Sequence, residues 1–162
     1  NKKEKNLAAF LNIPTINNLL NRVKGSLAEY YSAENVNSIV FEGGSIGDPA
    51  SINNHEVGIW KMLEKRGFID EKNIPQRIKN NNKIMVEFSK KTKGNYFVKY
   101  IHKIKKEDDF IMYPNMRNFE KIKKGQIIAK NNNLEVASPI DGYLLMPLYQ
   151  KIGNEGFYII CK

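Results

Sequence analysis

The sequence predicts an α+β chain in which an incomplete α/β part is followed by a small all-β module. In the first half, apolar residues recur at helical spacing around a single short apolar run at 38–41. From residue 83 onward, short runs rich in β-branched and aromatic residues alternate with Gly, Asn and Asp. The polar stretch at 80–82 separates the two patterns, so we expect one domain at 1–80 and another at 81–162.

The first domain is expected to be mainly helical. Helices or helical turns are predicted at 7–11, 15–24, Leu27–Ala33 and 50–66. Thr15 can cap the second of them, because its hydroxyl can accept a hydrogen bond from a free backbone N–H of the first turn. In the fourth, Ile59 and Leu63 lie one helical turn apart, and Gly67 can adopt the left-handed conformation that ends a helix.

The only strand predicted in the first domain lies at 38–41, between the third and fourth helices. A parallel sheet needs several strands to bury both of its faces. We therefore expect the remaining strands to come from a segment that precedes Asn1, or from another source. In the second domain, strands are predicted at 84–88, 96–104, 110–113, 126–129, 135–137, 143–146 and 157–160. Their short length and regular turns predict a barrel or barrel-sandwich domain.

The composition narrows the classes of partner. The formal net charge is +9, but the lysines are scattered among asparagines and acids. This pattern favours a solvated basic surface over a nucleic-acid site, which would bind with a steep dependence on salt. No apolar run approaches the ~20 residues that span a bilayer, so no membrane partner is expected. Cys161 is the only cysteine. A chain without disulfides is typical of a reducing compartment, and we expect a cytoplasmic protein.

Glu42 is the candidate catalytic residue. It follows the predicted strand and enters a glycine-rich loop at 43–47, after which Asp48-Pro49 opens the helix that carries His55. Small residues beside an acid let a substrate approach closely, and α/β enzymes hold proton-transfer groups at such strand ends. Two alternatives stay open at this point. Glu42 can instead bind the amides of the glycine loop, and His55 can be a surface or helix-packing residue.

Two sets of motifs resemble a known family. The first set is Phe41-Glu42-Gly43-Gly44, Asp48-Pro49, His55-Glu56, Trp60 and Gly67. The second is the segment 136–149, with Asp141-Gly142 and Met146-Pro147. In this order they resemble the succinylglutamate desuccinylase/aspartoacylase family, zinc hydrolases with a carboxypeptidase-like fold, whose bacterial members carry a C-terminal β module. The resemblance spans roughly residues 7–160. It implies the C-terminal part of the α/β domain followed by that module.

The resemblance also implies a mechanism. In the family, two His and one Glu hold zinc, and the first two ligands form a His-x-x-Glu motif. A separate Glu takes a proton from the attacking water and passes it to the leaving amine. By alignment that residue is Glu42. Neither histidine of the chain forms His-x-x-Glu, because Gly58 follows His55 and Lys105 follows His102 at that spacing. The family's ligands precede the base, so we expect zinc in the intact enzyme and no metal ligand in this chain.

The predicted function is therefore that of the C-terminal portion of a zinc-dependent hydrolase. It would cleave the amide, or ester, bond of an N-acylated amino acid or a similar small anionic compound, and would be inactive without the missing N-terminal segment of the same protein. Arg22, Arg66 and Arg77 stay open as residues that bind the anion. The alternative is a non-catalytic binding or structural module that docks a partner through its β domain. The oligomeric state is not predicted.

Overall fold

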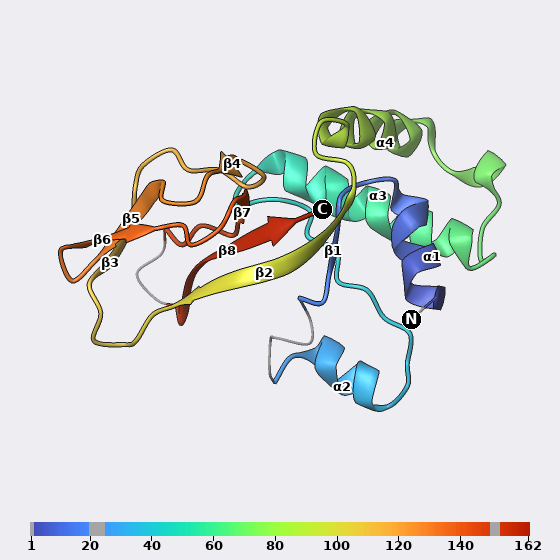
Figure 1. Cartoon of the computed structure of the whole chain (residues 1–162). Coiled ribbons are helices and arrows are strands. Elements are labelled where there is room, and N and C mark those ends of the chain that lie inside the picture. Colours follow the sequence, from blue (N-terminus) through green and yellow to red (C-terminus); the bar gives the residue numbers. More distant parts are fainter. Residues whose placement is uncertain (1, 20–24, 150–152) are drawn as a thin grey trace. The chain divides into compact units, whose positions relative to one another are not determined.

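The computed structural model describes residues 2–19, 25–149 and 153–162 (Figure 1). The chain forms two units, each with a core of its own. Unit 1 comprises Asn1–Thr15 and Leu20–Gly94, and unit 2 comprises Ile16–Leu19 and Asn95–Lys162. The predicted division after residue 80 falls inside the last helix of unit 1, and the chain passes into unit 2 between Gly94 and Asn95.

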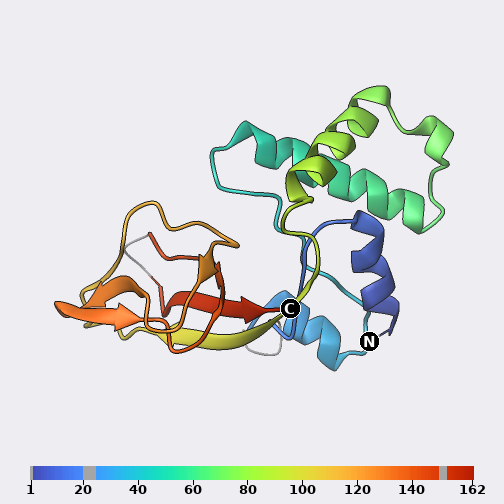
Figure 2. The same ribbon diagram turned by 45° about the horizontal axis from the view of Figure 1, so that its top comes forward.

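Over its described residues, the regular elements of unit 1 are mainly helices, joined by irregular segments. Its elements are α1 (Lys2–Leu11), α2 (Leu27–Ala33), α3 (Pro49–Lys65), a 3₁₀ turn η2 (Glu71–Asn73) and α4 (Gln76–Ser89). The helices α3 and α4 lie side by side in both ribbon views (Figures 1 and 2). The core of the unit consists of four buried side chains: Val57, Ile74, Ile78 and Met85. Phe41 and Trp60 pack against it while half-buried.

Local signals explain where the helices begin and end. The Ser26 hydroxyl caps α2 by accepting a hydrogen bond from the Glu29 N–H. The Asp48 carboxylate caps α3 in the same way, and Pro49 occupies its first turn, where no N–H is needed. Gly67, with φ +75°, follows the end of α3. The predicted helices at Leu27–Ala33 and 50–66 are confirmed as α2 and α3, and the predicted helical turn at 7–11 lies within α1.

The prediction of a strand at 38–41 is wrong, since these residues form no regular secondary structure. A strand is stable only when its backbone hydrogen bonds to a neighbouring strand. In the described part of unit 1, no strand lies beside the segment, so its β-forming side chains have no sheet to join.

Two further predictions of secondary structure are wrong. Residues 84–88 belong to α4 and not to a strand, because Ile78 and Met85, seven positions apart, share the buried face of a helix. Residues Thr15–Asn17 form strand β1 and not the start of a helix. The Asn17 and Asn18 side-chain amides donate to the carbonyls of Tyr96 and Val98, which fixes this segment in a sheet. The end of the predicted helix, at 20–24, lies outside the described residues.

Unit 2 contains two sheets. One has the order β1-β2-β8-β7-β4 and the other the order β3-β5-β6. The strands are β2 (Asn95–Lys103), β3 (Phe110–Met112), β4 (Lys121–Ile122), β5 (Ile127–Asn131), β6 (Leu134–Ala137), β7 (Gly142–Leu145) and β8 (Glu155–Cys161). The larger sheet is mixed, because β1 runs alongside β2 in the same direction, whereas β2, β8, β7 and β4 pair antiparallel. The predicted strands at 96–104, 110–113, 126–129, 135–137, 143–146 and 157–160 are confirmed.

Strand β8 is buried on both of its faces. Phe157 and Ile159 belong to a core that both sheets supply, with side chains from β3, β4, β5 and β7. Tyr158 and Ile160 point to the opposite face, where they join a second core with Tyr96 and Val98 of β2. This alternation follows from the two-residue period of a strand. Among the described residues, no helix combines the length and apolar character needed to cross a bilayer.

The motif at 138–142, which carries part of the family resemblance, builds a turn between the sheets. Ser138 is buried, and its hydroxyl donates to the Ile140 carbonyl at 2.7 Å. The Lys124 N–H donates to the Asp141 carboxylate at 2.7 Å, and the Cys161 thiol donates to the Asp141 carbonyl at 3.4 Å. The Ser138 hydroxyl, the Asp141 carboxylate and the Asp141 carbonyl thus each have a structural partner.

Candidate functional site

Glu42 lies on an irregular segment of unit 1 between α2 and α3. Its side chain is exposed, and its carboxylate has no hydrogen-bond or ion-pair partner among the described residues. The alternative in which Glu42 binds the amides of the glycine loop therefore finds no support in the contacts of this side chain.

The residues on either side of Glu42 are held by α3. The Asn54 side-chain amide donates to the Gly43 carbonyl at 2.7 Å. The Phe41 ring meets the His55 ring edge to face, with centroids 5.6 Å apart and planes at 89°. Phe41 also lies directly over Gly58, where an added Cβ would stand 3.1 Å from the Phe41 ring. The carboxylate is thus exposed while the backbone that carries it is anchored.

Gly43 allows the closest of these approaches. An added Cβ at this position would lie 2.3 Å from Nδ1 and 2.4 Å from Cε1 of His55. Real Cβ atoms do not come so near to another heavy atom, so only glycine fits here without displacing the imidazole. The glycine after Glu42 is therefore required by packing against α3.

The position of His55 follows from the first turns of α3. The Ser51 hydroxyl donates to the Asp48 carbonyl at 2.8 Å, and Nδ1 of His55 lies 2.7 Å from the Ser51 carbonyl oxygen. Because His55 lies one turn after Ser51, the helix itself brings the ring to this carbonyl. The predicted opening at Asp48-Pro49 thus determines where His55 stands.

The carboxylate of Glu56, the other acid of this motif, is already hydrogen-bonded to another side chain. Both guanidinium nitrogens of Arg77 donate to its carboxylate, at 2.6 Å and 2.5 Å. The hydrogen bonds from Arg77 lower the pKa of Glu56, and the same bonds raise the pKa of Arg77. Arg77, one of the three arginines considered for anion binding, is therefore already paired. Arg66 is exposed at the end of α3, and Arg22 lies outside the described residues.

His102 is a half-buried residue of unit 2. Its ring stacks on Phe157 with centroids 5.0 Å apart, and the Tyr100 hydroxyl lies 3.2 Å from its Nδ1. Its Nε2 is buried and has no hydrogen-bond partner among the described residues. Burial lowers the pKa of His102 below the usual value of 6.5, and Asp108 opposes this shift by Coulomb attraction.

Acid is expected to destabilise unit 2 through His102. The unfolded chain takes up a proton as the pH falls through 6.5, whereas the folded chain, whose His102 pKa is lower, resists it. Stability present above pH 6.5 is therefore lost as the pH falls through the folded pKa. Uptake of one full proton would change the free energy of unfolding by ~1.4 kcal/mol per pH unit. We expect only a fraction of this slope, because the ring is partly exposed. Urea unfolding of wild type and His102→Phe at about pH 7.5 and 5.5 measures it. Equal pH dependence in the two proteins would contradict this assignment.

The described residues do not fit a zinc site. No three side chains of the His, Cys, Asp and Glu types come together in the described part of the chain. The two histidines lie in different units, and each has another role. Nδ1 of His55 engages a backbone carbonyl, and His102 lies among aromatic rings with its Nε2 buried. Neither ring presents a free nitrogen next to a second ligand.

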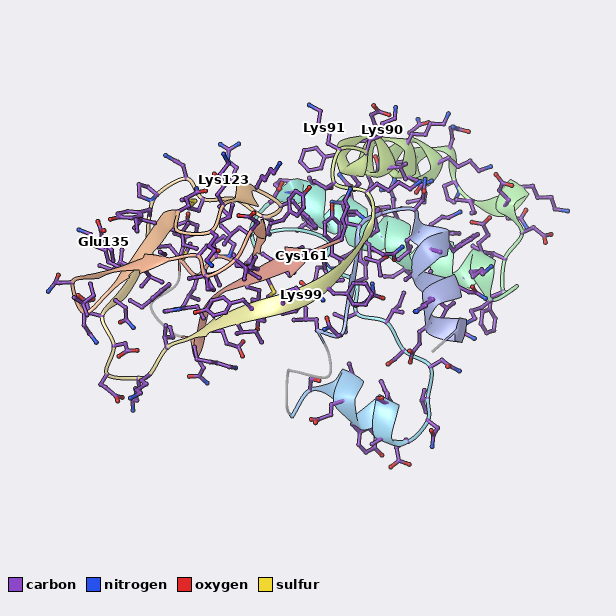
Figure 3. All side chains as sticks on the ribbon, viewed as in Figure 1. Lys90, Lys91, Lys99, Lys123, Glu135 and Cys161 are labelled. Atoms are coloured by element: carbon purple, nitrogen blue, oxygen red, sulfur yellow. The ribbon has the colours of Figure 1, made fainter. Side chains whose placement is uncertain are left out.

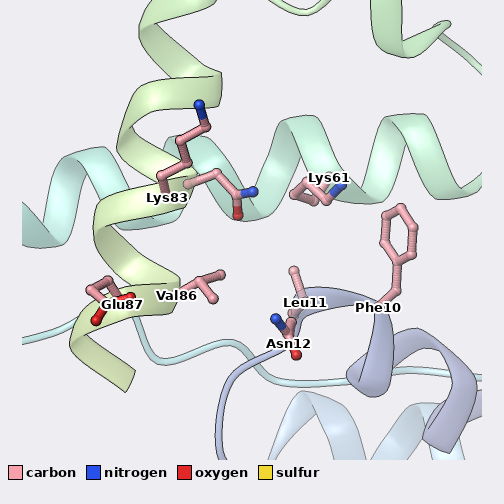
Figure 4. A pocket seen from close by; sticks show the side chains of 8 residues that line it. Phe10, Leu11, Asn12, Lys61, Lys83, Val86 and Glu87 are labelled. Carbon is pink, nitrogen blue, oxygen red and sulfur yellow. The ribbon is translucent and has the colours of Figure 1, made fainter. Parts of the chain in front are cut away.

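A pocket of about 450 Å³ lies in unit 1 among α1, α3 and α4 (Figure 4). Lys61 lines it, but its ammonium is bound to Glu64 at 2.6 Å and lies 4.2 Å from the centre of the Phe10 ring. Glu42 is not among the lining residues. The pocket and the candidate catalytic acid are therefore separate features of unit 1.

Basic side chains are spread over both units, as at Lys90, Lys91, Lys99 and Lys123 (Figure 3). Some of them are paired with acids. Lys90 contacts Glu87 at 3.1 Å, and Lys103 forms an ion pair with Glu155. Neighbouring acids thus neutralise some of these basic side chains.

No protein-family model and no curated protein matches the sequence. The structure matches a portion of a solved succinylglutamate desuccinylase from Vibrio parahaemolyticus, with 15% sequence identity and a TM-score of 0.43. The match covers 97% of this chain and 44% of that chain, so this chain spans less than half the length of the matched protein. The matched protein bears the name of the family that the motifs resemble.

Proposed function

We propose that this chain supplies the proton-transfer carboxylate of an enzyme that hydrolyses the amide bond of small N-acylated amino acids, and that this carboxylate is Glu42. The observation that carries the proposal is the state of Glu42. Its carboxylate is exposed and without a partner among the described residues, while Phe41 and Gly43 on either side are packed against α3.

The contrast with Glu56 shows why this state suits catalysis. The Glu56 carboxylate accepts two hydrogen bonds from Arg77, so it is held in its ionised form and is poorly disposed to take up a proton. Glu42 has no such partner. A carboxylate on an anchored backbone can accept a proton from the attacking water and return it to the leaving amine. Anchoring lowers the entropy lost when the reacting groups come together.

The metal of the related enzymes is a separate part of the proposal. The family that the sequence resembles uses zinc, and the described residues do not fit it. We therefore assign no metal-binding role and no metal-dependent step to this chain. In the proposed enzyme the zinc ligands and the anionic substrate's main contacts come from a segment outside these 162 residues. That segment is the proposed partner of unit 1.

The test is an assay of the protein in its full natural length against a panel of acylated amino acids. The panel contains N-succinylglutamate, which the name of the matched protein suggests, together with N-acetylaspartate. Release of the free amino acid is followed by chromatography, with and without added zinc. We expect amide cleavage by the full-length protein and none by the 162-residue chain alone. If the full-length protein releases no amino acid from any compound, the hydrolase proposal fails. That result would favour the alternative of a non-catalytic binding module.

A further inference from the structure

We propose that His55 is the positioning residue for Glu42: its imidazole contacts both neighbours of the acid and fixes the direction in which the carboxylate points. This inference deepens the proposed function and rests on it for its catalytic part. The structural part concerns only contacts within unit 1 and can be tested without any turnover.

The His55 side chain contacts both neighbours of Glu42. The His55 ring lies so close to Gly43 that an added Cβ would stand within 2.9 Å of three ring atoms. The same ring meets the Phe41 ring edge to face, with centroids 5.6 Å apart. Phe41 and Gly43 flank Glu42 directly in the sequence. One side chain thus contacts the residue before the acid and the residue after it.

The start of α3 sets the orientation of the His55 ring. The Ser51 carbonyl oxygen can only accept a hydrogen bond, and it lies 2.7 Å from Nδ1 of His55. Nδ1 therefore carries the hydrogen, and in the neutral ring Nε2 keeps its lone pair. Ser51 is itself fixed by its bond to the Asp48 carbonyl. The start of α3 thus fixes the ring, and the ring fixes the segment with Glu42.

These contacts restrain the backbone that carries Glu42. Asn54, the neighbour of His55 on α3, holds the Gly43 carbonyl by a second, independent bond. The backbone at Gly43 is therefore restrained through both its surface and its carbonyl. A carboxylate on a restrained backbone samples fewer directions, and a catalytic group displaced by about 1 Å can cost on the order of 100-fold in rate. His55 acts through this restraint and has no contact with the reacting atoms.

The structural test uses the 162-residue chain and NMR relaxation of the backbone amides. In wild type we expect Glu42 and Gly43 to have order parameters near ~0.85, as in rigid backbone, and in His55→Ala values below about 0.6. Asn53→Ala is the matched control, since Asn53 is exposed on the same helix. His55→Phe keeps a ring beside Phe41 and Gly43 and is expected to retain most of the order. Unchanged order in His55→Ala, or low order in wild type, overturns the inference.

The tautomer of His55 is a second structural readout. Nitrogen chemical shifts of the ring at high pH are expected to show the hydrogen on Nδ1. A hydrogen on Nε2 would place two acceptors 2.7 Å apart and would contradict the bond to Ser51.

The catalytic test is a double-mutant cycle in the full-length protein. His55→Ala is expected to lower kcat about 10- to 100-fold with little change in KM. In a Glu42→Gln background the same substitution is expected to have no further effect, because there is no acid left to position. A loss of equal size in both backgrounds indicates a general structural role and overturns the inference. If the full-length protein has no turnover at all, the proposed function fails, and the NMR measurements still decide whether His55 orders the Glu42 segment.

Discussion

Replacing Glu42 by glutamine is expected to lower kcat on N-acylated amino acids by about 10²- to 10⁴-fold, with KM nearly unchanged. Glutamine keeps the size and the hydrogen-bonding oxygen of the side chain but cannot accept a proton. The measurement is the steady-state kinetics of the full-length protein. Since Glu42 has no partner among the described residues, the free energy of unfolding is expected to stay within about 0.5 kcal/mol of wild type.

The matched control for this prediction is Glu71→Gln. Glu71 is an exposed acid of the same unit, in the short turn η2. Its replacement removes one negative charge, as Glu42→Gln does, and is expected to leave kcat and KM as they are. Turnover near the wild-type rate in Glu42→Gln would show that another group transfers the proton. Equal losses in the two variants would point to a general effect of charge.

Replacing Phe157 by alanine is expected to reduce the free energy of unfolding by about 3–5 kcal/mol. Phe157 is fully buried on β8, in the core that both sheets of unit 2 supply. Its ring contacts three other rings, with centroids 5.0 Å from His102, 5.9 Å from Tyr100 and 6.5 Å from Phe110. Alanine removes these contacts and leaves a cavity that the strands around it cannot close.

Phe97→Ala is the comparison for Phe157→Ala. Phe97 pairs with the end of β8 but is 40% exposed, so its truncation leaves little cavity. We expect a loss below about 1 kcal/mol. Urea unfolding followed by the near-ultraviolet circular dichroism of the tyrosines measures both values. Similar losses in the two variants would mean that the shared core contributes less to stability than its burial indicates.

Much of the fold follows from local sequence signals. The helix α3 begins at an acid followed by proline and ends before a glycine with positive φ, and both signals are legible in the sequence. The strands of unit 2 follow from β-branched and aromatic runs between turns. These signals depend on neighbours in the chain, so they need no knowledge of the tertiary structure.

The wrong predictions concern features that depend on distant residues. The segment 38–41 has the composition of a strand, but whether it becomes one depends on a neighbour to pair with. Thr15–Asn17 has two β-branched residues but is too short to show an alternating pattern, and its pairing depends on β2, about eighty residues away, whose carbonyls accept hydrogen bonds from the Asn17 and Asn18 side chains. In α4, the run at 84–88 is too short to distinguish helical from strand periodicity.

The candidate site could be predicted in part. The position of Glu42 before a glycine pair and a capped helix is visible in the sequence. Only the folded structure reveals that Glu42 has no partner among the described residues and that Glu56 pairs with Arg77. The contact of His55 with Gly43 is likewise visible only in the folded structure. The sequence shows a glycine and, twelve residues later, a histidine, and only the fold reveals that the absent side chain makes room for the ring.

Trp60 gives unit 1 an optical reporter of its own. It is the only tryptophan of the chain, and it packs half-buried against the unit 1 core, as Phe41 also does. Its fluorescence therefore senses the surroundings of α3 and no other part of the protein. A red shift of the emission will mark the opening of this core to water, and a compound or protein that displaces Phe41 will change the intensity. Binding near Glu42 can thus be followed by emission alone, without a chemical label.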